Sequence, residues 1–370
     1  MTASLASDTR DFLAARDAHP VSVSVLQPAD PFLDMAGEDL RRRIFLSESE
    51  TGETLCLRPE WTIPVCLDHI ESQAGTPRRY HYCGEVFRQR RDGPAEFLQA
   101  GIEDLGETDR PRADARSLAD AHALLTHTLP GRELRITLGD QAVFAAVLDG
   151  LGLPPAWQKR LLRAFGDPKL LATALDDIAN PGKRGLLAEG VGEQIAQSDE
   201  ETLANLLRGE MESAGFSPNA GRTPEEIAGR LLEKAELVSL RLPAAEMRAL
   251  KVFLAITITL ERAPDALAAF GRGAGISMDA ALEDFAARAD ALRGHSLPLD
   301  AIRYDAAFGR PLDYYTGLVF EIASPGDPRP LIGGGRYDRL LTLLGADAPI
   351  PGVGFSAWID RIESAAGRAL

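Results

Sequence analysis

The sequence has 370 residues, of which 45% are hydrophobic and 26% charged, a composition typical of a soluble globular protein of roughly two domains. A net charge of −15 argues against an extended nucleic-acid-binding surface, because such surfaces are basic. The cysteines form no CxxC pair, the first residues lack the features of a signal peptide, and no apolar run reaches the ~20 residues of a membrane span. We therefore expect a cytoplasmic protein with reduced thiols and no membrane contact.

The first part of the chain, residues 20–140, has the mixed pattern of helices and strands. Residues 22–34 and 41–48 have strand composition, and residues 134–140 alternate as a strand does. Residues 111–131 predict a helix, since a proline stands near the start and a Pro-Gly pair ends it.

The composition changes near residue 150 and again near residue 296. Residues 151–295 are rich in leucine and alanine at helical spacing, whereas strands, glycine turns and a helix alternate afterwards. We predict a sheet domain formed by residues 1–150 and 296–370, interrupted by a helical insertion at 151–295. Packing is the expected role of the insertion, and partner binding is the more specific hypothesis.

Two strands are predicted around an Asp-Gly-Pro turn in residues 83–106. Because successive side chains of a strand face opposite sides, Gln99, Gly101 and Glu103 share one face and the apolar residues between them the other. An amide and a carboxylate around a glycine would let a ligand lie against the sheet, with Gly101 leaving the room. A solvent-facing strand explains the same pattern, and these residues alone leave both explanations open.

Two other stretches carry groups that bind small molecules. Glu60 and Thr62 follow a proline bend and share a face, which suits an ammonium group, although a capped loop is the simpler explanation. Arg310 precedes Tyr314 and Tyr315, and an arginine can hold a carboxylate while a phenol hydrogen-bonds an imidazole. The simpler explanation of that stretch is an aromatic core pair beside a surface arginine.

Other chemistries find no support in the sequence. The run IGGGRYD matches no phosphate-binding loop and predicts a tight turn from strand to helix. There is no GxSxG nucleophile motif, and the scattered histidines and cysteines form no metal-binding motif.

The order of these stretches along the chain is more specific than any one of them. LRPEWT, FRQRR with EFLQAGIEDLG, GRPLDYYTG, GGGRYDRL and GVGFSAWIDR resemble the landmarks of the histidyl-tRNA synthetase catalytic domain, over residues 20–140 and 296–365. The resemblance implies an α+β fold, a class II aminoacyl-tRNA synthetase-like antiparallel sheet core flanked by helices and interrupted by a helical insertion. It also implies a homodimer formed through this core.

The resemblance further implies a pocket for the backbone groups of free histidine. Glu60 and Thr62 would accept hydrogen bonds from the α-ammonium group, and Gln99 would also contact the amino-acid backbone. Arg88 and Arg310 would face the carboxylate, or an acyl phosphate in a true synthetase.

The resemblance assigns the imidazole to a second group of residues. Glu103 would accept from a ring N–H, together with Tyr314 or Tyr315, and Tyr337 would close the pocket. Such a charge-assisted hydrogen bond contributes ~1.5–3 kcal/mol, enough for selectivity if several act together. Histidine is thus the expected ligand, with no other cofactor, no metal and no catalytic residue.

Four positions depart from the synthetase pattern on the side where ATP would bind. Arg90 stands where the family has a glutamate that accepts from the adenine amine, and Asp360 replaces another glutamate. Trp61 and Trp358 replace glycines, and an indole at 358 would fill the space of the nucleotide. The amino-acid half of the site is therefore expected to be intact and the ATP half lost.

Only 9 residues follow Arg361, fewer than the ~50 that an anticodon-binding domain needs, so we expect no such domain. A histidyl-synthetase-like core without these features resembles the regulatory subunits of ATP phosphoribosyltransferase, which act in the first step of histidine biosynthesis. The resemblance implies a non-catalytic chain that assembles with the short catalytic subunit, activates it and transmits feedback inhibition by histidine, without nucleic acid as a partner.

Two alternatives stay open. A divergent or split histidyl-tRNA synthetase, with its anticodon domain on another chain, is favoured by the presence of Arg88, Arg310 and Arg361. A stand-alone amino-acid sensor that acts on some other protein would use the same pocket.

Overall fold

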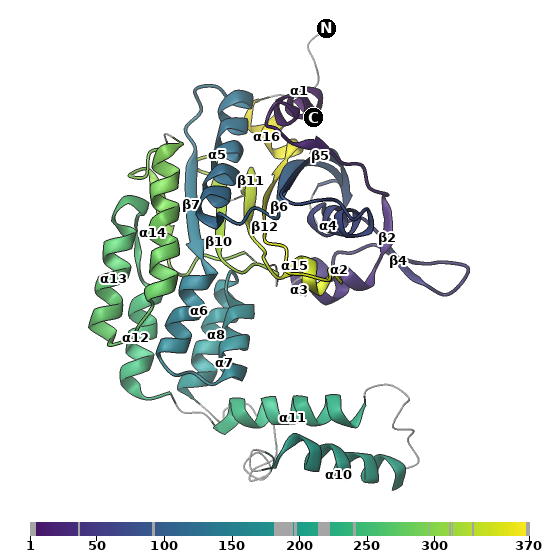
Figure 1. The fold of residues 1–370 in the computed structure, drawn as a ribbon, viewed down its shortest axis with the longest axis vertical. Coiled ribbons are helices and arrows are strands. Elements are labelled where there is room, and N and C mark those ends of the chain that lie inside the picture. Colours follow the sequence, from purple (N-terminus) through teal and green to yellow (C-terminus); the bar gives the residue numbers. More distant parts are fainter. Residues whose placement is uncertain are drawn as a thin grey trace. The chain divides into compact units, whose positions relative to one another are not determined.

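The structure is a computed structural model that describes residues 5–35, 38–90, 93–180, 195, 198–213, 223–239, 242–295, 297–310, 312, 314–327 and 329–367. The chain forms two compact units. The first comprises Met1–Ala146 and Phe253–Leu370, and the second comprises Val147–Val252. In the described part of the chain, all strands belong to the first unit and the second is helical (Figure 1).

Nine of the described strands form one sheet, and three form a smaller one. In spatial order, the large sheet contains β1 (His19–Pro20), β5 (Arg78–Phe87), β6 (Glu96–Leu105), β12 (Gly352–Trp358), β11 (Ile332–Arg336), β10 (Leu318–Ala323), β7 (Arg135–Asp140), β9 (Ile302–Asp305) and β8 (Thr257–Thr259). The small sheet contains β2 (Leu26–Pro28), β4 (Thr54–Leu57) and β3 (Leu46–Glu48). The large sheet is antiparallel apart from the pairs β1–β5 and β7–β9.

The helices divide between the two units. Those of the first unit are α1 (Leu5–Ala14), α2 (Asp30–Met35), α3 (Glu38–Arg41), α4 (Thr62–Glu71), α5 (Arg110–Thr128), the 3₁₀ turn η1 (Leu260–Arg262), α13 (Ala263–Ala274), α14 (Asp279–Gly294), α15 (Leu340–Leu343) and α16 (Ile359–Ala365). Those of the second unit are α7 (Pro155–Ala164), α8 (Pro168–Ala179), α10 (Glu200–Ser213) and α11 (Pro224–Ser239). The chain passes between the units through α6 (Gln141–Gly150) and α12 (Ala244–Leu254).

Local sequence explains most of these elements. The predicted helix at residues 111–131 is α5, whose first turn contains a proline and is capped by the Asp109 side chain. The strand predicted at 134–140 is β7. The strand predicted at 22–34 is wrong in its second half, where Asp30 and a following proline begin α2. Proline lacks an N–H and favours the first turn of a helix, a signal that outweighs the apolar composition there.

The predicted hairpin of residues 83–106 is present as β5 and β6, and the side chains of β6 alternate between two buried faces. Asp104 points to the face covered by α5, where Arg116 binds it. Glu103 points to the other face, where Thr62 of α4 donates a hydrogen bond to it. The polar side of this strand is therefore enclosed, which excludes the solvent-facing explanation.

A chain of buried charges connects α5 and α14 with the sheet. Arg288 Nε lies 2.7 Å from Asp114 Oδ2, and its Nη1 donates to Asp140. Arg336 Nε lies 2.7 Å from the other oxygen of Asp114. All four residues are at most 5% exposed. Charges so far from water must stay paired, so this network holds four segments, α5, α14, β7 and β11, in one arrangement.

The second unit is shorter than the predicted insertion of residues 151–295. Two helices within that range, α13 and α14, belong to the first unit. The physical reason is that α14 packs along α5 and supplies Arg288 to the buried charge network. Parts of the predicted insertion, including residues 181–194, lie outside the described residues.

We predict that Arg288→Ala lowers the free energy of unfolding by about 3–5 kcal/mol, because it leaves buried carboxylates without their partner. Arg293→Ala, on the same helix, is the control: its ion pair with Asp290 has exposed side chains (51% and 73%) and should contribute less than about 1 kcal/mol. Urea denaturation of both variants measures the difference. Equal losses would contradict a structural role for the network.

Candidate functional site

A cavity of about 100 Å³ opens on the face of the large sheet opposite α5. A single water molecule occupies about 10–15 Å³ by the same measure, so this cavity has room for a small molecule. Eight of the nine residues predicted for a histidine pocket line the cavity, and the ninth, Glu103, is hydrogen-bonded to two of them. The lining consists of Leu40, Arg43, Glu60, Thr62, Arg88, Gln99, Arg310, Leu312, Tyr314, Tyr315, Gly333, Tyr337, Gly354, Phe355, Ser356 and Trp358.

Glu103 is a buried carboxylate held by hydroxyl groups. The Thr62 hydroxyl donates to Oε1 over 2.8 Å, and the Tyr337 hydroxyl donates to Oε2. Glu103 is only 1% exposed and forms no ion pair with the described residues. Burial raises the pKa of Glu103 to about 8. A ligand N–H that reached this carboxylate would stabilise its ionised form.

Glu60 has a structural role as well as a place in the lining. Its carboxylate accepts from the backbone N–H groups of Thr62 and Ile63, both over 2.8 Å, at the start of α4. This arrangement caps the helix, as the simpler explanation of the sequence expected. Burial raises the pKa of Glu60, while the two backbone hydrogen bonds oppose the shift. Carboxylate oxygens accept more than one hydrogen bond, so the capped group can still receive a cationic donor.

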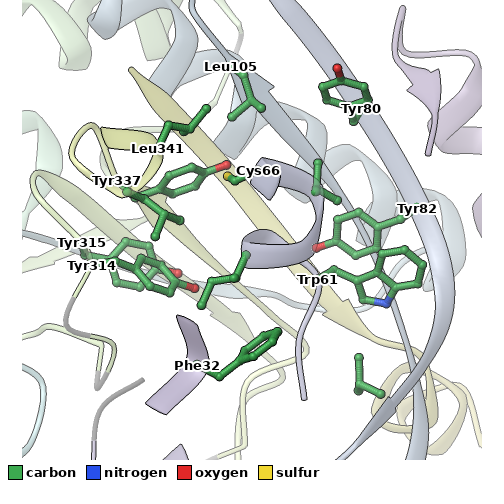
Figure 2. Packing of buried hydrophobic residues seen from close by; sticks show 14 of the residues in the cluster. Phe32, Trp61, Cys66, Tyr80, Tyr82, Leu105, Tyr314, Tyr315, Tyr337 and Leu341 are labelled. Atoms are coloured by element: carbon green, nitrogen blue, oxygen red, sulfur yellow. The ribbon is translucent and has the colours of Figure 1, made fainter. Parts of the chain in front are cut away.

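Three tyrosines form one wall of the cavity. The rings of Tyr314 and Tyr315 lie 4.9 Å apart, and Tyr314 meets Tyr337 edge to face at 5.9 Å. Figure 2 shows this group beside the helix that carries Cys66. Burial raises the pKa of Tyr315 to about 12 and raises the pKa of Tyr314 and Tyr337 well above the ordinary value, so all three hydroxyls keep their protons at neutral pH. The wall thus offers aromatic surface and neutral hydroxyl groups to a ligand.

Arg310 lies flat over β11, where a Cβ at Gly333 would overlap its guanidinium group. The triple glycine is therefore part of a strand, which corrects the predicted turn: a side chain at this position would displace Arg310. The ion pair of Arg310 with Glu321 spans 3.6 Å, and its Nε and Nη1 have no hydrogen-bond partner among the described residues. Arg88 donates its Nε to the Pro59 carbonyl over 2.6 Å. Both guanidinium groups face the cavity with donors to spare.

Gln99 completes the polar lining. It is 1% exposed, and its Oε1 has no hydrogen-bond partner within the described parts of the chain. Buried amide groups are nearly always hydrogen-bonded, so this one marks a place where a ligand group would be satisfied.

The departures from the synthetase pattern meet at one side of the cavity. Trp358 is 5% exposed and lies between two guanidinium groups, with Arg361 4.4 Å and Arg310 5.7 Å from its ring. Arg90 stacks on Phe97 and pairs with Asp360 at 3.4 Å. The two residues that replace family glutamates are thus bound to each other, and an indole occupies the cavity wall beside them.

Trp61, the fourth of these positions, does not line the cavity but packs against Tyr82, whose hydroxyl lies near Glu103. Its ring stacks on Tyr82 at 4.8 Å with an interplanar angle of 8°, and the Arg58 guanidinium lies 3.7 Å from its other side (Figure 2). The Tyr82 hydroxyl lies 3.3 Å from Glu103 Oε1. A Cβ at Gly101 would overlap the Phe355 carbonyl oxygen on β12 and would lie 2.6 Å from this hydroxyl. Gly101 therefore leaves room for the neighbouring strand and for Tyr82, and the prediction that it makes room for a ligand is wrong.

Sequence reasoning missed several lining residues. Leu40 and Arg43 come from a segment with no recognisable motif, and Leu312 is a missed residue within the GRPLDYYTG stretch. Ser356 is hydrogen-bonded to Tyr82 over 2.7 Å. The alternation within β12 could have indicated Ser356, since it shares a face with Gly354 and Trp358. No signal in the sequence brings Arg43 to this cavity, because its position depends on how α3 packs.

The cavity is lined by three arginines, the Glu60 carboxylate, the Gln99 amide and neutral hydroxyls, two of which bind the Glu103 carboxylate. This set suits a small zwitterion with an additional N–H donor. Within the described ranges, no group of three or more His, Cys, Asp or Glu side chains has the arrangement of a metal site. The described helices include none long and apolar enough to cross a membrane.

Comparisons with known proteins agree on the family. The sequence model of the histidyl-tRNA synthetase family matches residues 5–208 and 202–362. The ATP phosphoribosyltransferase regulatory subunit of Mesorhizobium japonicum is 64% identical over 360 residues, which cover 97% of this chain and 96% of that protein. The protein of the same name from Chelativorans sp. is 61% identical, with 98% of both chains covered. A crystal structure from Bacillus halodurans, described as an ATP phosphoribosyltransferase regulatory subunit/histidyl-tRNA synthetase, superposes with a TM-score of 0.64 at 20% identity, covering 98% of this chain and 79% of that one.

The antiparallel sheet, its flanking helices and the position of the cavity define a class II synthetase-like domain of the histidyl type. Within this class, the chain belongs to the family of ATP phosphoribosyltransferase regulatory subunits. As a member of that family it is a regulatory chain and not an enzyme.

We predict a pH-dependent effect of Glu103→Gln on stability. Because burial raises the pKa of Glu103 from 4.5 to about 8, the folded protein holds a proton that the unfolded chain releases between these values. Stability due to this group therefore falls as pH rises through that window, and a glutamine avoids the loss. The unfolding free energy of the variant, measured relative to wild type, should increase between about pH 5 and 8. A difference that does not change with pH would contradict the proposed state of Glu103.

Proposed function

We propose that this chain assembles with the short-form catalytic subunit of ATP phosphoribosyltransferase, activates it, and transmits feedback inhibition by histidine, which binds in the cavity. Support comes from the names of relatives at 64% and 61% identity over nearly the whole chain. The enzyme would act in the first step of histidine biosynthesis, in the cytoplasm, and the regulatory chain would form a homodimer through its synthetase-like core.

The histidine assignment rests on one observation: the polar groups around the small cavity either lack a hydrogen-bond partner or can form another hydrogen bond. The α-ammonium group would bind Glu60 and Thr62, and the carboxylate would take the free donors of Arg310. An imidazole N–H would bind Glu103, whose hydroxyl partners leave it without a cation. The buried amide of Gln99 would be satisfied by the amino-acid backbone.

The opposite side of the cavity supports a regulatory role. Adenine recognition needs an acceptor for the exocyclic amine and a flat surface on the backbone. Arg90, a donor, is bound to Asp360, and the Trp358 indole lies between two arginines at the cavity wall. An amino acid that binds here would have no adjoining nucleotide to react with, so binding itself would be the signal.

We predict that titration calorimetry detects histidine binding to the purified chain, and that Glu103→Gln weakens it by roughly 10- to 100-fold, since a charge-assisted hydrogen bond contributes about 1.5–3 kcal/mol. Glu85→Gln, an exposed carboxylate on the neighbouring strand β5, is the matched control and should bind like wild type. Absence of heat in wild type, or equal affinity in both variants, would mean that the cavity is not a histidine site.

We also predict that adding this chain to a purified short-form catalytic subunit raises the rate of ATP phosphoribosyl transfer, and that histidine lowers that rate. Light scattering of the mixture should show a hetero-oligomer. In complexes with Glu103→Gln, activation should persist while inhibition requires roughly 10- to 100-fold more histidine, by the same free-energy difference. No association between the two chains would reject the assembly, whatever the outcome of calorimetry.

A divergent or split histidyl-tRNA synthetase is the second candidate function, because Arg88 and Arg310 remain in the cavity of a chain that matches the synthetase family. Histidine-dependent exchange between ATP and pyrophosphate separates the two candidates. We expect no exchange, and sustained turnover would favour the synthetase.

A further inference from the structure

We infer that the cavity is coupled to the start of α6, the helix that leads the chain into the helical unit, through the buried charge network that begins beside Tyr337. The inference rests on the proposed function, since histidine is the ligand whose binding would act on the network. It assigns a regulatory role to four residues that do not line the cavity: Asp114, Asp140, Arg288 and Arg336.

The coupling begins at the hydrogen bond between Tyr337 and Glu103. The Tyr337 hydroxyl donates to Glu103 Oε2, while Thr62 occupies Oε1. Glu103 is 1% exposed and does not itself line the cavity, whereas the Thr62 and Tyr337 side chains that bind it do. An imidazole N–H therefore reaches the carboxylate only if one of these side chains moves, and Tyr337 is the one that continues into the network. Tyr337 directly follows Arg336, the last residue of β11, and a displacement of the tyrosine is transmitted to that arginine through the backbone.

The middle of the path consists of three further charged residues. Arg336 binds Asp114 of α5 over 2.7 Å, and the other oxygen of Asp114 accepts from Arg288 of α14 over 2.7 Å. Arg288 then donates from its Nη1 to Asp140 at the end of β7. Each carboxylate oxygen has a defined partner, and side-chain exposure is 7% or less throughout. A buried charge cannot be left unpaired at low cost, so a shift of one member requires its partners to follow.

The path ends on a helix that crosses between the units. The second oxygen of Asp140, Oδ1, accepts from the backbone N–H groups of Ala142 and Val143, over 2.9 and 3.1 Å, at the start of α6. One turn later, Phe144 stacks on Phe253 of α12, with ring centroids 6.0 Å apart. α6 and α12 are the two segments by which the chain enters and leaves the second unit. Asp140 thus holds one of the two connections directly, and the aromatic pair links it to the other.

A ligand shifts such a network only if it binds one arrangement more tightly than another. The movement needed to reach Glu103 supplies that difference, because the arrangement with a displaced Tyr337 is the one that accepts the imidazole N–H. The well-packed interior around the ion pairs favours discrete arrangements over gradual deformation. The start of α6, which leads the chain into the helical unit, is therefore the expected output of the signal.

Hydrogen exchange followed by mass spectrometry tests the inference on the wild-type protein. We expect saturating histidine to change the exchange rate of the amides at the start of α6 on the order of 5-fold or more, the lower range of allosteric coupling. Peptides from α1, which carries none of the network's residues, are the internal control and should not change. Unchanged exchange in α6 at saturation would overturn the inference.

Asp140→Asn tests the role of the network itself. The asparagine retains an acceptor for the helix N–H groups but removes the charge that pairs with Arg288. We expect the variant to bind histidine while the response of α6 falls to less than about 2-fold, well below the usual range of coupling. Asp120→Asn is the matched control: Asp120 lies on α5, is 6% exposed, and pairs with Arg79 and Arg16, away from α6. This control should keep the full response.

The outcomes separate the inference from the proposed function. If wild type gives no calorimetric heat with histidine, the proposed function fails and the coupling has no ligand. If it binds histidine and α6 does not respond, or Asp140→Asn responds like wild type, the function stands and the inference fails. Should Asp140→Asn not fold, as judged by circular dichroism, Arg288→Lys takes its place and the wild-type exchange experiment remains decisive.

Discussion

The burial of the Glu103 carboxylate in the middle of the sheet is the constraint on which the site depends. Without a cation beside it, the group relies on hydroxyls from α4 and from the residue after β11. Those hydroxyls arrive only because the neighbouring strands leave room, since a Cβ at Gly354 would overlap the carboxylate and a Cβ at Gly352 would overlap Tyr337. The glycines of β11 and β12 are thus explained by the side chains that lie over them.

One fold can serve more than one function when the side chains of its site differ. The exchange of an acceptor for Arg90 is accommodated because Asp360 lies within reach of it, at 3.4 Å. The indole of Trp358 packs near the guanidinium groups of Arg361 and Arg310, 4.4 and 5.7 Å from its ring. These changes form a coherent packing arrangement, which is what a side of the cavity that no longer needs a nucleotide would be expected to adopt.

The buried charge network of Arg336, Asp114, Arg288 and Asp140 lies outside the cavity but starts next to Tyr337, one of its lining residues. A buried ion pair is weak evidence for stability, because a hydrophobic replacement often does as well, but it fixes a unique arrangement of the groups around it. Here the network joins β11, α5, α14 and the start of α6, four elements that the chain separates by up to 222 positions between Asp114 and Arg336. The proposed coupling would use this network to connect the cavity with the start of α6.

Sequence alone determined the elements with strong local signals and the family to which the chain belongs. Capping and proline signals located α5, alternation located β6 and β7, and the ordered motifs gathered Glu60, Gln99, Arg310 and Tyr337 into one predicted pocket. Only the tertiary structure decided what packs against what. In the structure, Gly101 leaves room for the Phe355 carbonyl and the Tyr82 hydroxyl, and Arg310 lies over Gly333 of the triple glycine. Helix α14 belongs to the sheet unit, where its Arg288 pairs with Asp114. These features depend on contacts between residues distant in the chain, and neither periodicity nor spacing encodes them, because a local pattern fixes which face a side chain takes and not which partner it meets there.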